Sequence, residues 1–240
     1  MTLLVNSFEG GTSGIAITAG NSGGVSGNAF DTATQGSGAT LNYDKTEAAH
    51  GLLSCNITTT SAAISEINWA ASFGSGIATA YWRGYYFFTG NPSATIRLWN
   101  ATTSGSSNCT VSLNSSGKIT VTYGSGGTSF VTFTSSVPLN AWFRVEGMIT
   151  ISAAAGQVAA ILYEPLDTST PTETHTSAAS LNTGTTGPTI YAWGNSSTVA
   201  SVGPYWVDDV GLSSTGYIGP VDSVKSGGSG GALAALLTTM

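Results

Sequence analysis

The chain has 240 residues, of which 41% are hydrophobic and only 8% are charged, and its formal net charge at pH 7 is −6. This length fits one large all-β domain, and an average soluble domain carries about 25% charged residues. We therefore expect a surface made mostly of Ser, Thr, Asn and Gly. The few basic residues are scattered along the chain, which excludes the basic patch of a nucleic-acid-binding protein.

Alternating segments dominate the chain, and helical periodicity is nearly absent. Residues 81–88 carry large side chains at both odd and even positions, which predicts a central strand that is covered on each face. In the next segment, Ile96 and Leu98 alternate with Arg97 and Trp99. We therefore expect Arg97 and Trp99 to share one face of a strand.

The clearest hairpin joins residues 111–113 to residues 119–123 through the turn 114–117, which ends in Gly. Residues 142–149 and 158–163 alternate in the same way, whereas the Thr-rich residues 167–188 predict a long loop. Many strands separated by polar turns predict an all-β fold, an antiparallel two-sheet sandwich.

The C-terminus divides the chain into three parts: a sandwich over residues 1–220, a Gly/Ser-rich linker over 221–231, and an apolar peptide over 232–240. A Gly/Ser run is a flexible tether, and nine residues are too few for a helix that is stable alone. We expect this peptide to attach the module to a partner, and the alternative is a terminus without function. The attachment residues would be the apolar ones, Leu233, Leu236, Leu237 and Met240.

Both ends of the chain bear on the expected localisation. Its apolar run of six residues is far shorter than the roughly 20 that span a bilayer, so we expect no membrane insertion. The first residues lack the basic segment of a signal peptide. We expect synthesis in a cytoplasm without classical export.

Histidines and cysteines offer little catalytic chemistry. His50 and His175 lie outside any Gly-x-Ser-x-Gly context, and lone histidines are more often structural than catalytic. Cys55 and Cys109 each lie in a strand-like segment and are expected to be buried as small hydrophobic residues. A disulfide between them is the alternative.

Carboxylates are also poorly placed for catalysis. A retaining glycanase needs two carboxyl groups about 5–5.5 Å apart, which alternate positions of one strand supply. Glu146 instead shares its face with Arg144, a pattern typical of a structural ion pair or of a lectin-type polar contact. Asp208 and Asp209 are adjacent, so we expect their side chains to point to opposite faces of a strand. We predict that the chain is not an enzyme.

Five segments together resemble one family. They are Asn6-Ser7-Phe8-Glu9-Gly10-Gly11, Ala49-His50-Gly51-Leu52-Leu53-Ser54-Cys55, Ala141-Trp142-Phe143-Arg144-Val145-Glu146, Tyr205-Trp206-Val207-Asp208-Asp209-Val210 and Gly216-Tyr217-Ile218-Gly219-Pro220. In this order they resemble the concanavalin-like, laminin-G-like jelly rolls, as does the hairpin around Gly117. The resemblance implies two antiparallel sheets and a concave face that often binds glycans.

The resemblance has two further implications. Related jelly rolls hold a structural Ca²⁺ between the N-terminal Glu segment and the last strand, which here implies Glu9 with Asp208 or Asp209. The alternative is that the two aspartates only hydrogen-bond neighbouring loops. Chains of this type also occur as minor tail, fibre or capsid-decorating proteins of viruses of actinobacteria.

These observations lead to one main hypothesis. We expect a non-catalytic protein on the virion surface that binds other virion proteins through its tail, forms a homo-oligomer in the assembly, and offers a weak site for cell-surface glycans. The expected ligand-binding residues are Arg97, Trp99, Trp142 and Arg144. The alternatives are a soluble carbohydrate-binding module whose tail is incidental and a glycan-active hydrolase with a carboxylate pair that we do not find.

Overall fold

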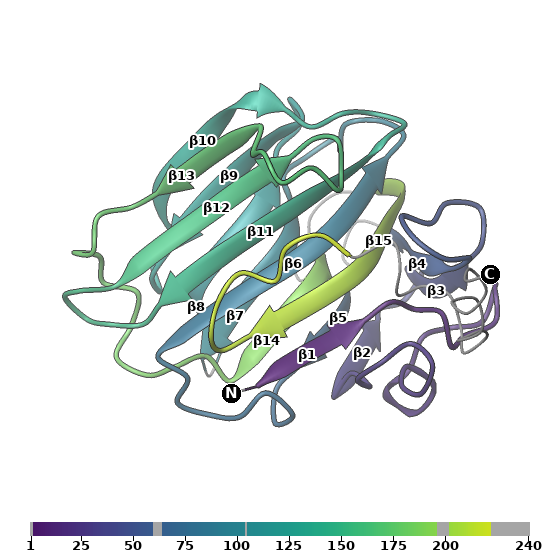
Figure 1. Ribbon diagram of the computed structural model, residues 1–240, viewed down its shortest axis with the longest axis horizontal. Coiled ribbons are helices and arrows are strands. Elements are labelled where there is room, and N and C mark those ends of the chain that lie inside the picture. The colour runs from purple at the N-terminus through teal and green to yellow at the C-terminus, as the bar shows by residue number, and fades with distance from the viewer. Residues whose placement is uncertain (1, 60–63, 104, 196–201, 222–240) are drawn as a thin grey trace, which may run out of the picture.

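The computed structural model describes residues 2–59, 64–103, 105–195 and 202–221. Within these residues the chain forms two antiparallel sheets packed face to face (Figure 1), so the predicted fold class is confirmed. The described residues contain no α-helix and one short 3₁₀ helix, η1 (Ala19–Asn21). Among them, no helix is long and apolar enough to cross a membrane.

The front sheet of Figure 1 has eight strands. Its strands, in spatial order, are β13 (Glu173–Thr176), β12 (Gln157–Tyr163), β11 (Trp142–Thr150), β6 (Thr79–Phe88), β15 (Val202–Ser213), β4 (Ser54–Thr59) and β3 (Thr40–Asp44). The eighth strand, β1 (Leu3–Asn6), pairs with the end of β15. The predicted central strand is β6, which lies between β11 and β15.

The back sheet has seven strands. In spatial order they are β10 (Thr128–Ser136), β9 (Lys118–Tyr123), β8 (Ser106–Leu113), β7 (Ile96–Thr103), β14 (Ile190–Asn195), β5 (Ser65–Trp69) and β2 (Thr32–Gln35). The predicted hairpin is confirmed as β8 and β9, with Gly117 at φ 72° in the turn. The predicted long loop over 167–188 is only partly correct, because it contains the edge strand β13.

Aromatic side chains hold the two sheets together. The indole of Trp82 on β6 stacks on that of Trp99 on β7, with ring centroids 4.5 Å apart and planes 10° apart. Trp193 Nε1 donates a hydrogen bond to the carbonyl oxygen of Arg83, at 2.9 Å, across the same interface. Gly147 lies opposite Trp82 on β11, where a Cβ atom would come within 2.4 Å of the indole nitrogen. Only glycine therefore allows the indole to lie this close to β11.

Two predictions concern the remaining residues. Cys55 and Cys109 are both buried and free, as expected for small hydrophobic residues. The linker from residue 222 and the attachment peptide, with Leu233, Leu236, Leu237 and Met240, lie outside the described residues.

Candidate functional site

A charged cluster occupies the outer face of the front sheet. Neighbouring strands place Asp208, Tyr85, Arg144 and Tyr163 in one row, because these residues are direct partners in the register of β15, β6, β11 and β12. The cluster, as named below, consists of His50, Arg83, Tyr85, Arg144, Glu146, Asp167, Asp208 and Asp209.

His50 is bound at both ring nitrogens. Its Nδ1 lies 2.6 Å from Asp209 Oδ2, and its Nε2 lies 3.0 Å from Asp167 Oδ2. Carboxylate oxygens accept hydrogen bonds, so both contacts are made at once only when both nitrogens carry a proton. Burial lowers the pKa of His50, but the bonds and charges of Asp209 and Asp167 outweigh it and raise the pKa above 6.5. The two contacts together therefore favour the imidazolium form of His50.

The predicted pairing of Arg144 with Glu146 is present as a buried ion pair. Arg144 Nε lies 2.8 Å from Glu146 Oε1, and each side chain is only 1% exposed. The other two nitrogens of Arg144 donate to the carbonyl oxygens of Leu166 and Thr168. Its guanidinium also lies 3.9 Å from the ring centroid of Tyr163. Two nitrogens of this guanidinium are thus hydrogen-bonded to backbone carbonyls, and the third lies at ion-pair distance from Glu146.

Residues 217–221 lie over the cluster, and Figure 1 shows this yellow segment crossing in front of β6. Gly219 accepts a hydrogen bond from Arg83 Nη1 at 2.8 Å and donates one to Glu146 Oε2 at 3.2 Å. The backbone nitrogen of Val221 donates to the hydroxyl of Tyr85 at 2.9 Å. The C-terminal segment thus covers the sheet face and is hydrogen-bonded to it.

Asp208 and Asp209 do not point to opposite faces, so that expectation is wrong. The register of β15 shifts between Asp208 and Gly211, and Asp209 has a φ of 42°. This bulge brings both carboxylates to the segment around His50: Asp208 Oδ2 accepts a hydrogen bond from the backbone nitrogen of Ala49 at 2.9 Å. Burial and the neighbouring carboxylate of Asp209 raise the pKa of Asp208. Hydrogen bonds from three backbone N–H groups act in the opposite direction and lower it.

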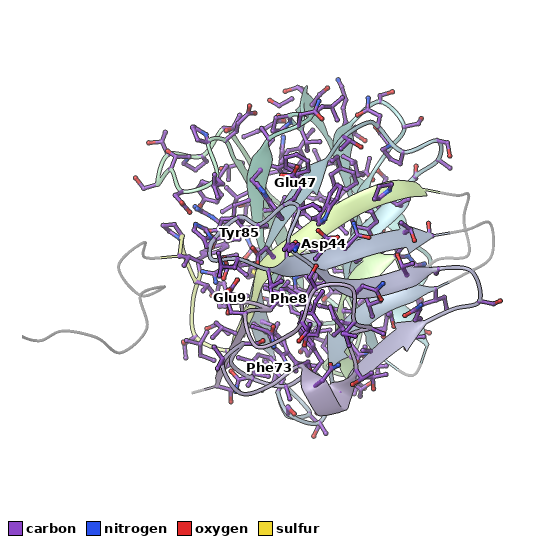
Figure 2. All side chains as sticks on the ribbon, turned by 90° about the vertical axis from the view of Figure 1, so that its right-hand side faces the viewer. Phe8, Glu9, Asp44, Glu47, Phe73 and Tyr85 are labelled. Carbon is purple, nitrogen blue, oxygen red and sulfur yellow. The ribbon has the colours of Figure 1, made fainter. Side chains whose placement is uncertain are left out.

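The metal site expected from Glu9, Asp208 and Asp209 is not assembled. Glu9, labelled in Figure 2, accepts hydrogen bonds from the backbone nitrogens of Leu52 and Leu53, each at 2.9 Å. In the described part of the chain, no three His, Cys, Asp or Glu side chains lie close enough to hold a metal ion. The three carboxylates instead hold the loop of residues 49–53, which was the alternative interpretation.

The expected ligand-binding residues are not brought together either. Arg97 and Trp99 belong to the back sheet, whereas Trp142 and Arg144 belong to the front sheet. A bulge between Arg97 and Trp99 changes the alternation of β7, so the two residues do not share a face. Trp99 is 0% exposed in the core. The expectation that Arg97 and Trp99 share one face is therefore wrong, and the four candidate residues lie on two different sheets.

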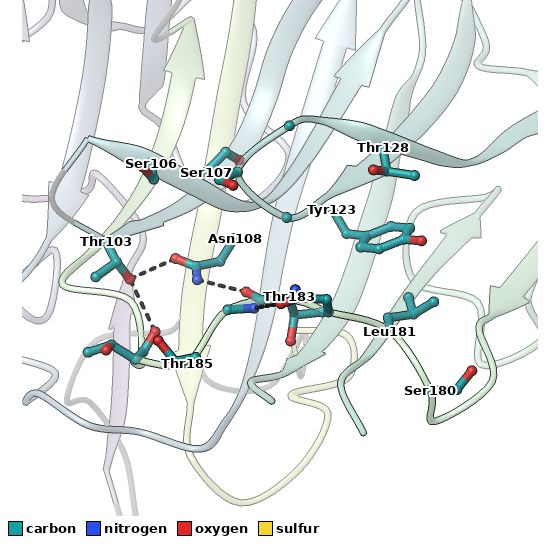
Figure 3. Close-up of a pocket in the computed structure, with 16 residues that line it drawn as sticks. Thr103, Ser106, Ser107, Asn108, Tyr123, Thr128, Ser180, Leu181, Thr183 and Thr185 are labelled. Atoms are coloured by element: carbon teal, nitrogen blue, oxygen red, sulfur yellow. Dashed lines mark hydrogen bonds between the residues drawn. The ribbon is translucent and has the colours of Figure 1, made fainter. Parts of the chain in front are cut away.

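A pocket of about 630 Å³ opens at the rim of the back sheet (Figure 3). Three segments form its walls: Thr103 and residues 106–108 on either side of the β7–β8 connection, residues 123–126 and Thr128 around the β9–β10 turn, and residues 180–186. Its lining consists of Ser, Thr, Asn and Gly with Tyr123 and Leu181, and no charged residue. Sequence reasoning missed this pocket because its three walls are polar turns from distant parts of the chain.

The comparisons with known proteins concern the fold. No protein-family model matches the chain, and no curated protein matches it. Among solved structures, it is similar to an endo-β-1,4-glucuronan lyase from the fungus Trichoderma reesei, with a TM-score of 0.60 and 12% identity over 87% of this chain and 93% of that one.

Two further structures have the same arrangement. The cellulose-induced protein Cip1 has a TM-score of 0.56 and 14% identity over 77% of this chain and 89% of its own. A protein of unknown function from Shewanella oneidensis MR-1 has a TM-score of 0.57 and 12% identity over 88% of this chain and 84% of its own. At these identities the similarity concerns the fold alone. The chain has the concanavalin A-like jelly-roll fold.

Proposed function

We propose that this chain is a non-catalytic surface module, which presents a concanavalin A-like sandwich on a larger assembly and contacts carbohydrate there. One observation carries the non-catalytic assignment: both ring nitrogens of His50 and the hydroxyl of Tyr85 are bound to other groups of the same protein. A general acid or base must reach a substrate proton within hydrogen-bond distance.

The similarity to a lyase makes the enzymatic alternative concrete. His50 would be the strongest candidate for a base, but carboxylates occupy both of its nitrogens. Tyr85 would be a second candidate, but its hydroxyl contacts Asp167 Oδ1 at 3.1 Å and the backbone nitrogen of Val221 at 2.9 Å. Residues 217–221 also lie over this face. These contacts favour a structural role for the cluster.

The assembly is proposed from the sequence. A low-charge module with a Gly/Ser spacer and an apolar end suits attachment to other virion proteins at a virion surface, in the setting that the family resemblance suggests. Repetition of a weak glycan site over an assembly raises its apparent affinity by roughly 10²–10⁴. The alternative is a soluble carbohydrate-binding module, for which residues 222–240 would be incidental.

Two measurements test the proposal. Incubation of the full chain with glucuronan and with neutral glucans is expected to yield no cleavage products, and turnover that His50→Gln abolishes would contradict the non-catalytic assignment. The native mass of the full chain is then compared with that of a chain truncated after Val221, alone and with isolated parent particles. Only the full chain is expected to associate. If both chains remain monomeric and unbound, the assembly role is wrong.

A further inference from the structure

We propose that the pocket at the rim of the back sheet binds an uncharged carbohydrate unit. This inference rests on the proposed contact with carbohydrate and assigns it to one place and one ligand class. A volume of about 630 Å³ falls within the range of about 300–1,000 Å³ that small-ligand pockets occupy.

Asn108 makes the pocket rigid by joining its three walls. Its Nδ2 donates to the carbonyl oxygen of Thr183 at 2.8 Å, and its Oδ1 accepts from the hydroxyl of Thr103 at 2.8 Å. Its backbone oxygen accepts from the nitrogen of Gly124, at 2.9 Å, in the β9–β10 turn. Asn108 itself is 5% exposed. A preformed pocket loses little conformational entropy when a ligand binds.

Free hydroxyl groups remain around the opening. Six exposed residues of the lining form no side-chain hydrogen bond to any other described residue: Ser106, Ser125, Thr128, Ser180, Thr185 and Thr186. Each hydroxyl can donate one hydrogen bond and accept others. A sugar ring presents the same kinds of group along its edge, so these side chains can exchange hydrogen bonds with it.

Tyr123 and Leu181 supply the apolar part of the pocket. Both are partly buried and line the same cavity (Figure 3). An aromatic ring offers a flat apolar face together with a polar end, and the C–H face of a sugar packs on such a ring. Apolar contact from these two residues, with hydroxyls around them, is the mixed lining that a carbohydrate needs.

The absence of charge in the lining sets the ligand class. No Lys, Arg or His lines the pocket, so an acidic sugar would lose hydration of its carboxylate without gaining a cation. The net charge of −6 further disfavours an anion. We therefore expect neutral hexose-type units to bind and uronic or sialic acids to be rejected.

The test uses two pocket variants and one matched control in the full-length chain. Tyr123→Ala removes the aromatic face, and Ser125→Trp fills the opening from an exposed turn residue. Ser115→Trp places the same side chain on the exposed β8–β9 turn, outside the pocket lining. The probes are neutral gluco-, manno- and galacto-oligosaccharides and matching uronate oligomers, with affinity measured by calorimetry and ligand-observed NMR.

Each pocket variant is expected to weaken neutral-sugar binding at least about tenfold, as truncation of an aromatic anchor does, whereas Ser115→Trp keeps the affinity of the unaltered protein. Uronate oligomers are expected to bind at least about tenfold more weakly than neutral ones. If the protein binds sugars and both pocket variants bind equally well, the pocket assignment is wrong while the proposed function stands. If the unaltered protein binds no probe, both fail.

Discussion

The Nδ1 atom of His50 lies 2.6 Å from Oδ2 of Asp209, a residue 159 positions away in the chain. This contact fastens the loop before β4 to the bulge of β15. Because the other ring nitrogen contacts Asp167, one side chain links three distant segments on the outer face of the front sheet. The arrangement needs a protonated ring, which makes the stability of this face depend on pH.

The His50 contact predicts a loss of stability at alkaline pH. The pKa of His50 is raised in the folded protein, so its contribution is complete below the unfolded value of about 6.5 and is lost as pH rises through the folded value. We expect His50→Gln to destabilise the protein by about 1 kcal/mol at pH 6 and by less at pH 9. Urea unfolding at both pH values measures this difference, and a constant difference would contradict it.

For Glu173, at the edge between the sheets, we predict the opposite pH dependence of stability, with a loss at acidic pH. Burial opposes ionisation, but hydrogen bonds from His175 and from the backbone nitrogens of Thr134 and Ser135 lower the pKa of Glu173 to about 2. Its contribution is therefore present above the unfolded value of about 4.3 and is lost as pH falls through about 2.

We expect Glu173→Gln to cost about 1–2 kcal/mol at pH 7, and the difference from the unaltered protein should shrink as pH falls from 5 toward 2. Thermal unfolding across this range measures it. The control is Glu164→Gln on the exposed turn after β12, because Glu164 takes part in its hydrogen bonds through the backbone. If the control Glu164→Gln showed the same pH dependence of stability as Glu173→Gln, the prediction would be refuted.

Because Arg144 and Glu146 form an ion pair, we predict that substitutions of these two residues have non-additive effects on the free energy of unfolding. Arg144→Met leaves the buried carboxylate of Glu146 without its charged partner, which costs about 3–5 kcal/mol. Replacing both residues, with Arg144→Met and Glu146→Leu, removes the unpaired charge and is expected to cost less than the single change. A double-mutant cycle in urea measures the coupling, and strict additivity would mean that the two side chains do not interact.

We predict that substitution of Trp99 lowers the stability of the protein and leaves ligand binding unchanged. Its indole is 0% exposed and stacks on Trp82, so Trp99→Ala is expected to cost about 3–5 kcal/mol and Trp99→Phe less. Trp99→Phe should bind neutral oligosaccharides like the unaltered protein. Loss of binding in a folded Trp99→Phe protein would restore this residue as a ligand contact.

Local patterns were sufficient to predict the fold class and several strands. Alternation over residues 142–149 and 158–163 predicted β11 and β12, and the Gly-containing turn predicted the β8–β9 hairpin, because the two-residue period of a strand is a local property. The pairing of Arg144 with Glu146 followed from the same rule. A low content of charge likewise predicted a surface of small polar side chains.

Tertiary structure decided which residues meet. Bulges in β7 and β15 reversed the expected orientation of Trp99 and of Asp209, because register depends on the partner strand as well as on the sequence. The rim pocket brings together turns that lie up to about 80 positions apart, between Thr103 and residues 180–186. Such contacts form only when the two sheets pack, so strand periodicity alone does not encode them.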